Sequence, residues 1–360
     1  MFRRCNWSYS AFVSRRRSQV VPRSETAARF RNSKPHFQFS PTRQLARVFG
    51  KREYSCHSGF IRENPLLPAR HVIALKDLLV YLDQTEESLV RLRLAVDLAA
   101  RHESRLTALY VREWNLAQLD ARKSAELGLV SAEAIHGLDR GIEASIDAVA
   151  ERWRSSLHAL TRGHGGLQAQ LHCVDGVAAV VVPRYARCAD LSILGLDQPE
   201  GPASVNYTFS EHMLFVTGRP VLFVPALETF TTLGRHIVVA WNASRPAARS
   251  VNDALPLIER AERTTVLMLN PAGFTQGHDA PPGERIVEHL KRHGASPNLV
   301  RIENIPPGSI ADKLQTEARA YGADLIVAGA FGHPRLWEKM LGGVTHDLIA
   351  RTRLPLFMSH

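Results

Sequence analysis

Short apolar runs alternate with helical stripes along most of this chain, beginning near residue 77. The runs Leu78–Leu82 and Leu106–Val111 predict buried strands. Between them, residues 86–101 predict an amphipathic helix, with Leu89, Leu92, Val96 and Ala99 on one face. Asp83-Gln84-Thr85 is typical of a turn with a helix cap. Strands that alternate with helices imply a parallel sheet covered on both faces.

The same alternation continues to the C-terminus. Further strands are expected at Leu167–Cys173, Leu191–Leu194, Val221–Val224, His236–Ala240, Thr265–Leu269, Leu299–Glu303, Leu325–Ala328 and Leu354–Met358. Further helices are expected over residues 138–160, 176–188, 245–261, 283–293, 309–321 and 344–351, whereas residues 113–135 look irregular. Pro183 should kink or shorten the helix over residues 176–188. The fold class is therefore α/β.

An internal repeat divides the chain into two halves. Ala186–Gly195 parallels Ala320–Gly329, and Gly218–Val224 parallels Arg353–Met358. Leu79–Asp83 likewise parallels Val238–Asn242. We interpret these as two tandem doubly wound parallel-sheet domains, residues 72–229 and 234–360, preceded by a basic extension over residues 1–71.

Charge separates that extension from the rest. The formal net charge is +10, but the first 70 residues hold 15 of the 45 Lys/Arg and only 3 of the 35 Asp/Glu. The extension is open to three interpretations: a basic arm for nucleic acid or anionic lipid, a targeting peptide, or a disordered segment without a role, even an over-extended reading frame. We favour the third. The remaining charges nearly balance, so we expect no nucleic-acid partner for the folded part.

Cysteine usage and hydropathy indicate the compartment. Cys5, Cys56, Cys173 and Cys188 form no CxxC pair, which favours a reducing cytoplasm. No apolar run approaches the roughly 18 residues of a membrane span, so no membrane partner is expected.

The strongest motif lies near the C-terminus. After the run Asp324–Ala328, Gly329, Gly332 and Gly342 follow the spacing Gly-x2-Gly-x9-Gly, ahead of a predicted helix. Glycine permits a tight turn or the close approach of a ligand, and helix N-termini suit phosphate. This pattern resembles the universal stress protein family, most closely over residues 322–360 and more broadly over 72–360. The resemblance implies tandem domains of the Rossmann-like, adenine nucleotide alpha-hydrolase-like fold.

The resemblance also implies an ATP site in the second half. By position, its residues are Asn242, Gly329, Gly332, Gly342, Gly343 and Val344. The nucleotide could bring Mg²⁺, and no other metal is expected. The alternative interpretation is that the glycines serve only the turn and close packing.

Several residues depart from the family pattern. Gly343 replaces a Ser or Thr, Asn242 replaces an Asp, and the bulky Trp241 adjoins the adenine position. The first half keeps Asp83, but residues 196–199 after Gly195 contain no second glycine. Neither half therefore carries the complete pattern.

One histidine pair and one single histidine carry weaker signals. His289 and His293 stand one helical turn apart, as metal ligands can, but no third ligand is apparent, so a solvated helix face is favoured. His346 follows the glycine motif and is expected on an exposed helix turn.

We expect a cytoplasmic stress-response protein that acts by binding or regulation and not by turnover. One alternative is a ligand-free structural module that pairs through Val221–Val224 and Leu354–Met358, as a homodimer or an internal pseudo-dimer. Another is an enzyme, such as a nucleotidyl transferase, an ATP pyrophosphatase or a weak ATPase. The motifs Gly-x4-Gly-Lys-Ser/Thr, His-x-Gly-His and Ser-Gly-Gly-x-Asp-Ser, which such chemistry uses, do not occur.

Overall fold

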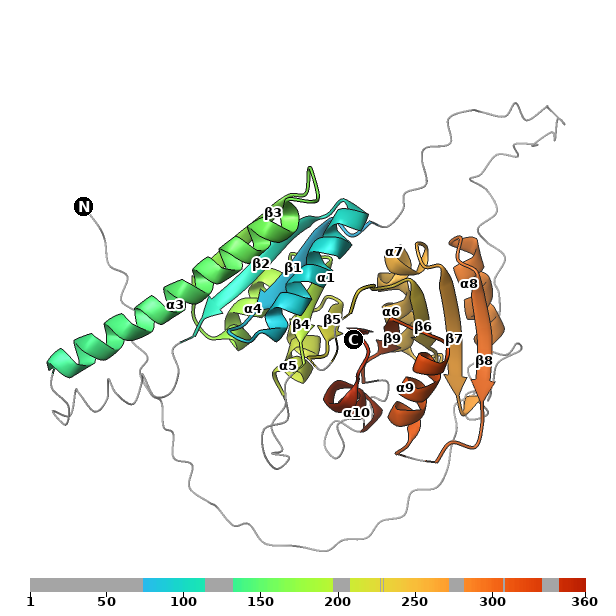
Figure 1. Ribbon diagram of the computed structural model, residues 1–360. Helices are drawn as coiled ribbons and strands as arrows, with labels where there is room; N and C mark the ends of the chain where they lie inside the picture. Colours follow the sequence, from blue (N-terminus) through green and yellow to red (C-terminus); the bar gives the residue numbers. More distant parts are fainter. Residues whose placement is uncertain are drawn as a thin grey trace, which may run out of the picture. The chain divides into compact units, whose positions relative to one another are not determined.

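The structure is a computed structural model (Figure 1). It describes residues 74–113, 132–196, 208–226, 228, 230–271, 282–306, 308–331 and 343–360. For residues 132–140, 142 and 282 only the backbone is described. The predicted basic extension over residues 1–71 lies outside the described residues.

The first half is a parallel sheet with the strand order β3-β2-β1-β4-β5. Its elements are β1 (Asp77–Leu82), α1 (Glu87–His102), β2 (Arg105–Arg112), α3 (Ala132–Thr161), β3 (Ala169–Asp175), α4 (Ala178–Ala186), β4 (Leu191–Gly195), α5 (Phe209–Val216) and β5 (Val221–Val224). Every strand predicted in this half is present. The helix containing Pro183 is shorter than residues 176–188, as that proline predicts.

The second half repeats the same order, written from the other side as β10-β9-β6-β7-β8. Its elements are β6 (His236–Ala240), α6 (Arg245–Asp253), α7 (Leu255–Ile258), β7 (Arg263–Leu269), α8 (Pro282–Arg292), β8 (Pro297–Ile302), α9 (Ile310–Ala320), β9 (Leu325–Gly329), α10 (Gly343–Arg351) and β10 (Leu356–Ser359). The predicted α/β fold, two doubly wound parallel units in tandem, is confirmed.

The two units join through their last strands. β5 pairs antiparallel with β10, and Leu222 stands opposite Phe357 at the centre of the pair. Val221 pairs with Ser192 of β4, and Leu356 pairs with the corresponding residue of β9, Ile326. The next residues along, Leu222 and Phe357, are therefore equivalent in the two halves. A local two-fold axis therefore passes between them, and the pairing closes both edges into one ten-stranded sheet.

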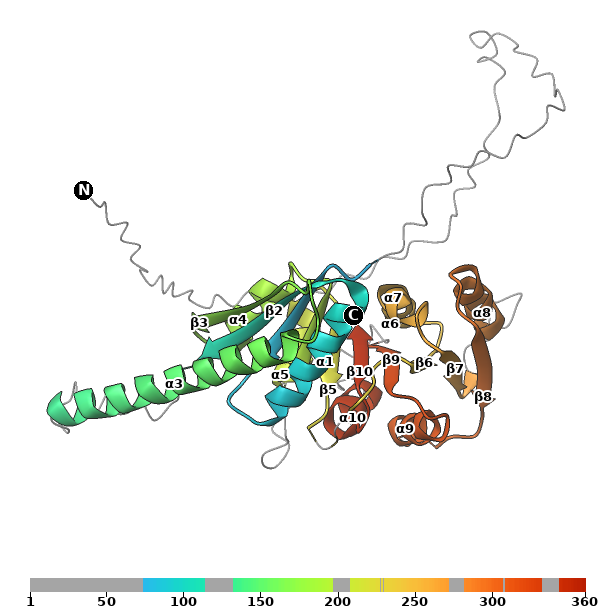
Figure 2. The ribbon, with the colours of Figure 1, turned by 45° about the horizontal axis from the view of Figure 1, so that its top comes forward.

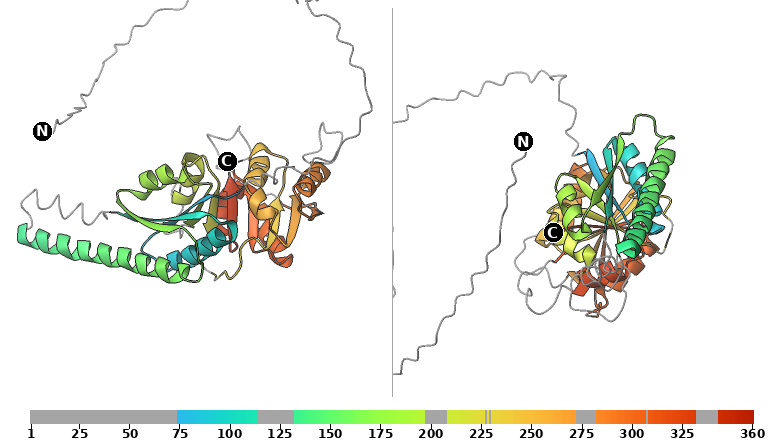
Figure 3. Two further views of the ribbon diagram at one scale, coloured as in Figure 1. Left: turned by 90° about the horizontal axis from the view of Figure 1, so that it is seen from above. Right: turned by 90° about the vertical axis from the view of Figure 1, so that its left-hand side faces the viewer.

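Two layers of helices cover this sheet. Along β1, Leu78, Val80 and Leu82 belong to one buried cluster and Leu79 to the other, because successive strand side chains point to opposite faces. The first cluster packs under α1, α3, α6, α7 and α8, and the second under α4, α5, α9 and α10. Figure 3 shows the strands of the first half between α1 and α3 on one side and α4 and α5 on the other.

Two local predictions need correction, and one helix was missed. No side chain of the turn after β1 caps α1. The N-cap residue is Glu86, which makes no side-chain cap, and Asp83 accepts its hydrogen bond from the Thr85 amide within the turn. The helix predicted over 245–261 breaks at Ala254, because Pro256 cannot donate to the helix ladder. Helix α5 was not predicted, although Thr208 and Glu211 form a capping box at its start.

Helix α3 is also longer than predicted. Its 30 residues span about 45 Å, roughly twice the length of the strands beneath it. Its N-terminal part consequently extends past the strand ends (Figures 1 and 2). Among the described residues, no helix has both the length and the apolar character needed to cross a bilayer.

Candidate functional site

The second half has a topological switch point between β6 and β9. These neighbours are parallel, and the chain leaves β6 toward β7 on one side and later returns as β9 on the other. Ala240 pairs with Ala328, so Asn242 and Gly329 both lie at the carboxyl edge of the sheet. Open α/β sheets bind ligands at this edge. The structure thus brings together two of the residues predicted for the ATP site.

The turn from β6 into α6 is built from side-chain caps. Oδ1 of the exposed Asn242 accepts a hydrogen bond from the Ser244 amide at 3.1 Å. Ala243 takes the left-handed conformation, at φ 56°. Oγ of Ser244 then accepts from the Ala247 amide at 3.3 Å, which caps α6. One acceptor of Asn242 is therefore used within the turn.

Gly329 lies directly under the first turn of α6. A Cβ atom built on it would lie 2.8 Å from Cα of Ala247 and would overlap the backbone of Pro246. Any other residue would push α6 away from the tip of β9. Close packing alone therefore accounts for glycine at this position.

The start of the glycine motif is tied to its far end. The Phe331 amide donates to Oγ1 of Thr345 at 3.1 Å, and Phe331 has a left-handed φ of 55°. This bond brings the strand tip to the first turn of α10, where Gly343 and Val344 are exposed. A Cβ on Gly343 would meet nothing within 4 Å. Gly332 and Gly342 lie outside the described residues.

Ser250 fixes α6 onto the ends of two strands. Its buried hydroxyl donates to the Ala328 carbonyl at 2.7 Å and accepts from the Ser359 amide at 2.8 Å. The hydroxyl of Ser359 in turn donates to Asp253 at 2.9 Å. Sequence reasoning missed Ser250 because a serine in the middle of a helix carries no recognisable site signal.

The corresponding place in the first half is filled by an ion pair. Asp83 Oδ2 lies 2.5 Å from Nη2 of Arg91, whose side chain is only 5% exposed. Burial pushes the pKa of Asp83 up, but Arg91 and hydrogen bonds from Thr85 and Ser88 outweigh burial and leave that pKa below its usual value. The sequence predicted the position of Asp83 but not its partner.

The glycine-motif end of the second half also contacts α5 of the first half. The rings of Phe331 and Phe215 stack with centroids 4.4 Å apart, and His360 packs edge-on against both. His346 has its Nδ1 2.9 Å from the buried carboxylate of Glu211. His346 is half exposed, as expected, but this contact was not predicted.

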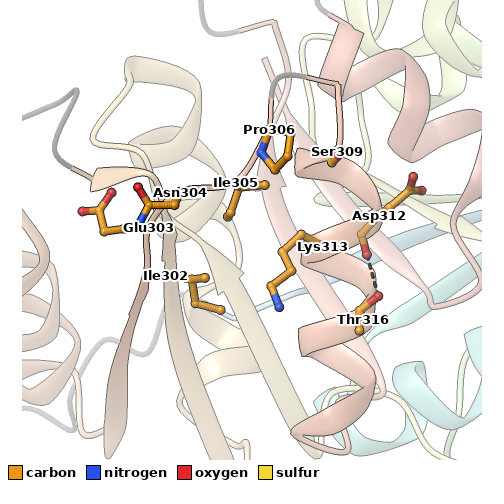
Figure 4. A pocket seen from close by; sticks show the side chains of 9 residues that line it. All are labelled: Ile302, Glu303, Asn304, Ile305, Pro306, Ser309, Asp312, Lys313 and Thr316. Atoms are coloured by element: carbon orange, nitrogen blue, oxygen red, sulfur yellow. Dashed lines mark hydrogen bonds between the residues drawn. The ribbon is translucent and has the colours of Figure 1, made fainter.

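An open pocket of about 430 Å³ lies where the end of β8 leads into α9 (Figure 4). Asn270 shapes it by exchanging two 2.9 Å hydrogen bonds with the backbone of Ile305. Figure 4 shows the lining residues, which are Ile302, Glu303, Asn304, Ile305, Pro306, Ser309, Asp312, Lys313 and Thr316. Of the predicted ATP-site residues that the structure describes, none lines it.

His289 in α8 and His293, directly after this helix, contact each other with their rings tilted by 58° and the centroids 4.7 Å apart. Nδ1 of His293 lies 3.6 Å from Glu259. The described residues contain no group of three or more His, Cys, Asp or Glu arranged to hold a metal ion.

Comparison with known proteins identifies the fold. No protein-family model matches this sequence, and no curated protein matches it significantly. A universal stress protein from Archaeoglobus fulgidus DSM 4304 has a similar structure, with a TM-score of 0.57, 16% identity and coverage of 79% of this chain and 95% of that one.

Two other solved structures are more distant. A putative universal stress protein from Pseudomonas aeruginosa UCBPP-PA14 is 14% identical over 79% of this chain and 93% of that chain, with a TM-score of 0.48. UspA from Lactobacillus plantarum is 19% identical over 42% of this chain and 97% of that chain, with a TM-score of 0.31. On its similarity to the Archaeoglobus structure, the chain has the universal stress protein fold, with two copies of the unit in one polypeptide.

Proposed function

We propose that this protein is a tandem member of the universal stress protein family that binds an adenine nucleotide, ATP in the first instance, in its second half. Binding changes its interactions in the cytoplasm during a stress response, and turnover is not its role. Mg²⁺ accompanies the nucleotide. The proposed site residues are Asn242, Gly329, Gly332, Gly342, Gly343 and Val344.

One observation carries this proposal. The Phe331–Thr345 hydrogen bond holds the first turn of α10 against the tip of β9, at the switch point where Asn242 ends the neighbouring strand. Amides at the start of α10 then face the edge where an α/β sheet takes its ligand. The adjacent Arg245, exposed in the first turn of α6, adds positive charge on the same edge.

Gly343 allows a direct test of this site. The resemblance places a hydroxyl there, and the structure leaves open space around it. Isothermal titration with ATP, ADP and AMP should give one binding event for the wild type, and Gly343→Ser should bind more tightly. The matched control is Gly141→Ser, which also lies in open space on a helix but in α3. Absence of heat and of thermal stabilisation for both the wild type and Gly343→Ser, at millimolar nucleotide, would remove ATP from the function.

A second candidate function is a ligand-free pairing module. The packing of α6 on Gly329 favours it, because that glycine has a structural reason to be present without a ligand. The internal β5–β10 pair would then be the main product of the duplication. The same titration separates the two functions, and a phosphate-release assay on the nucleotide-bound protein tests the weak ATPase.

A further inference from the structure

The carboxyl edge of the first half differs from that of the second at one buried position. In strand register, Leu82 and Gly195 correspond to Trp241 and Gly329, so Asp83 corresponds to Asn242. Counting forward into the following helix, Arg91 takes the place of Ser250. One half therefore buries a guanidinium where the other buries a hydroxyl.

The guanidinium of Arg91 lies on the tip of β4. A Cβ atom on Gly195 would lie 2.8 Å from Cζ of Arg91 and would overlap Nη1. Gly195 is thus the surface on which this planar group rests, whereas the backbone of α6 covers Gly329 in the second half. Both halves have glycine at this position, but different neighbours require it: the Arg91 guanidinium in the first half and the α6 backbone in the second.

Asp83 uses most of its acceptor capacity within the chain. Its Oδ1 accepts from the Thr85 amide at 2.8 Å, from the Thr85 hydroxyl and from the Ser88 hydroxyl at 2.8 Å. Its Oδ2 accepts from Arg91 at 2.5 Å. A carboxylate offers about four lone-pair positions, two on each oxygen, so Oδ1 is fully used and Oδ2 is engaged by Arg91 with one position left.

The turn around Asp83 is also closed from the α3 side. Trp153, 1% exposed, donates its indole N–H to the Asp83 carbonyl at 3.1 Å. Arg152 donates to the Gln84 carbonyl at 2.9 Å and pairs with Glu86 at 2.6 Å. Nε of Arg91, by contrast, is buried and has no hydrogen-bond partner among the described residues. Burying this donor without a partner costs free energy, which the contacts of the guanidinium with Asp83 offset.

We propose that Arg91 is a built-in occupant of the first half's strand-tip site, a guanidinium of the chain itself bound between Asp83 and Gly195. The site thus selects a planar cation of the guanidinium class and is closed to other ligands. The occupancy follows from this geometry alone. Its consequence, one nucleotide per chain, rests on the proposed function.

Chemical rescue tests the occupancy. Arg91→Ser, which installs the residue of the second half, should lower the melting temperature, and millimolar methylguanidinium should restore part of that loss by binding one equivalent. The matched control is Arg93→Ser, an exposed arginine on the same helix, which should melt like the wild type. Equal responses to methylguanidinium in all three proteins, or none in Arg91→Ser, would overturn the proposal.

A measurement on the wild type covers the case in which Arg91→Ser does not fold. The Nε–H proton of Arg91 should exchange with solvent far more slowly than that of Arg93 in NMR spectra, with Arg91→Lys used to assign the signal. Equal exchange rates would contradict a bound guanidinium.

Titration with ATP then separates this proposal from the proposed function. One nucleotide per chain supports both. Two per chain would overturn the closed first site and leave the proposed function standing. None would remove the proposed function, and the methylguanidinium result would still decide the occupancy of the first half.

Discussion

His346 and Glu211 occupy equivalent positions in the two halves, and their side chains meet with Nδ1 2.9 Å from Oε1. Glu211 lies ten residues before Val221, and His346 lies ten residues before Leu356, which is equivalent to Val221 in strand register. The Glu211 side chain is 2% exposed and also accepts from the Thr208 amide in the capping box. One carboxylate therefore both starts α5 and holds α10.

This contact predicts energetic coupling between the halves. In a double-mutant cycle, Glu211→Ala and His346→Ala should show a coupling energy of about 0.5–3 kcal/mol in urea unfolding, as contacting polar pairs do. Glu211→Ala alone should cost more than His346→Ala, because it also removes the cap of α5. A coupling energy indistinguishable from zero would mean that the pair contributes nothing to docking.

Gly329 and Gly343 should respond differently to the same substitution. Gly329→Ala places Cβ into the backbone of α6 and should destabilise the fold by about 1–3 kcal/mol. Gly343→Ala adds a methyl group in open space on a helix and should be neutral or slightly stabilising. Denaturant midpoints of the two variants provide the measurement. Equal losses would contradict the packing role assigned to Gly329.

Acid should release the Asp83–Arg91 pair. Because the pKa of Asp83 is lowered in the folded state, its stabilising contribution is full above the ordinary aspartate pKa and is lost as the pH falls below about 4. Asp83→Asn should therefore lose stability at pH 7 and show a weaker further loss in acid than the wild type. The control is Asp97→Asn, which breaks a half-exposed pair with Arg101. This variant should lose stability in acid to the same extent as the wild type.

His102 predicts a second pH effect in a different window. Burial first, and then Arg260 and Arg101, lower the pKa of His102 to about 4. The unfolded chain takes up this proton near pH 6.5 and the folded chain only near pH 4, so stability should fall as the pH drops from 6.5 to about 4. His102→Gln should flatten that slope, and the exposed His158→Gln should not. Unfolding curves at pH 7, 5.5 and 4.5 would show the difference; an unchanged slope in His102→Gln would refute the assignment.

The closed β5–β10 pair predicts the oligomeric state. Since each strand satisfies the other's open edge within one chain, light scattering should give the mass of a single chain. The outer strands of the sheet are β3 and β8. A stable dimer would show that one of those edges, or a helical face, also pairs.

Much of the architecture could be predicted because its signals are local. Val221–Val224 is wholly apolar, and Leu191–Leu194 has Ser192 as its one polar residue, as is typical of strands buried on both faces. The repeat around Gly195 and Gly329 revealed the duplication without coordinates. Helix α5 was missed for another reason: its capping signature, Thr208 and Glu211, precedes a segment too short for a clear helical period.

The site was less predictable because its contacts are distant in sequence. Gly329 lies against Ala247, 82 residues earlier, so the motif alone could not separate a ligand-binding glycine from a packing glycine. Arg91 stands on the apolar stripe of α1 beside Leu92, where a charged residue looks like a break in the pattern. Its partners Asp83 and Gly195 become visible only when the strand tips are assembled.

The pairing of Glu211 with His346 shows what fusion of the two units permits. In a dimer of identical subunits, a residue this close to the symmetry axis faces its own copy, so a glutamate would meet a glutamate. Covalent linkage removes that constraint, because the two partners are encoded separately and can become complementary. It also keeps them together at any dilution. For the same reason, a fused pair can have an arginine at one strand tip and a serine at the other. Two identical subunits would have the same residue at both.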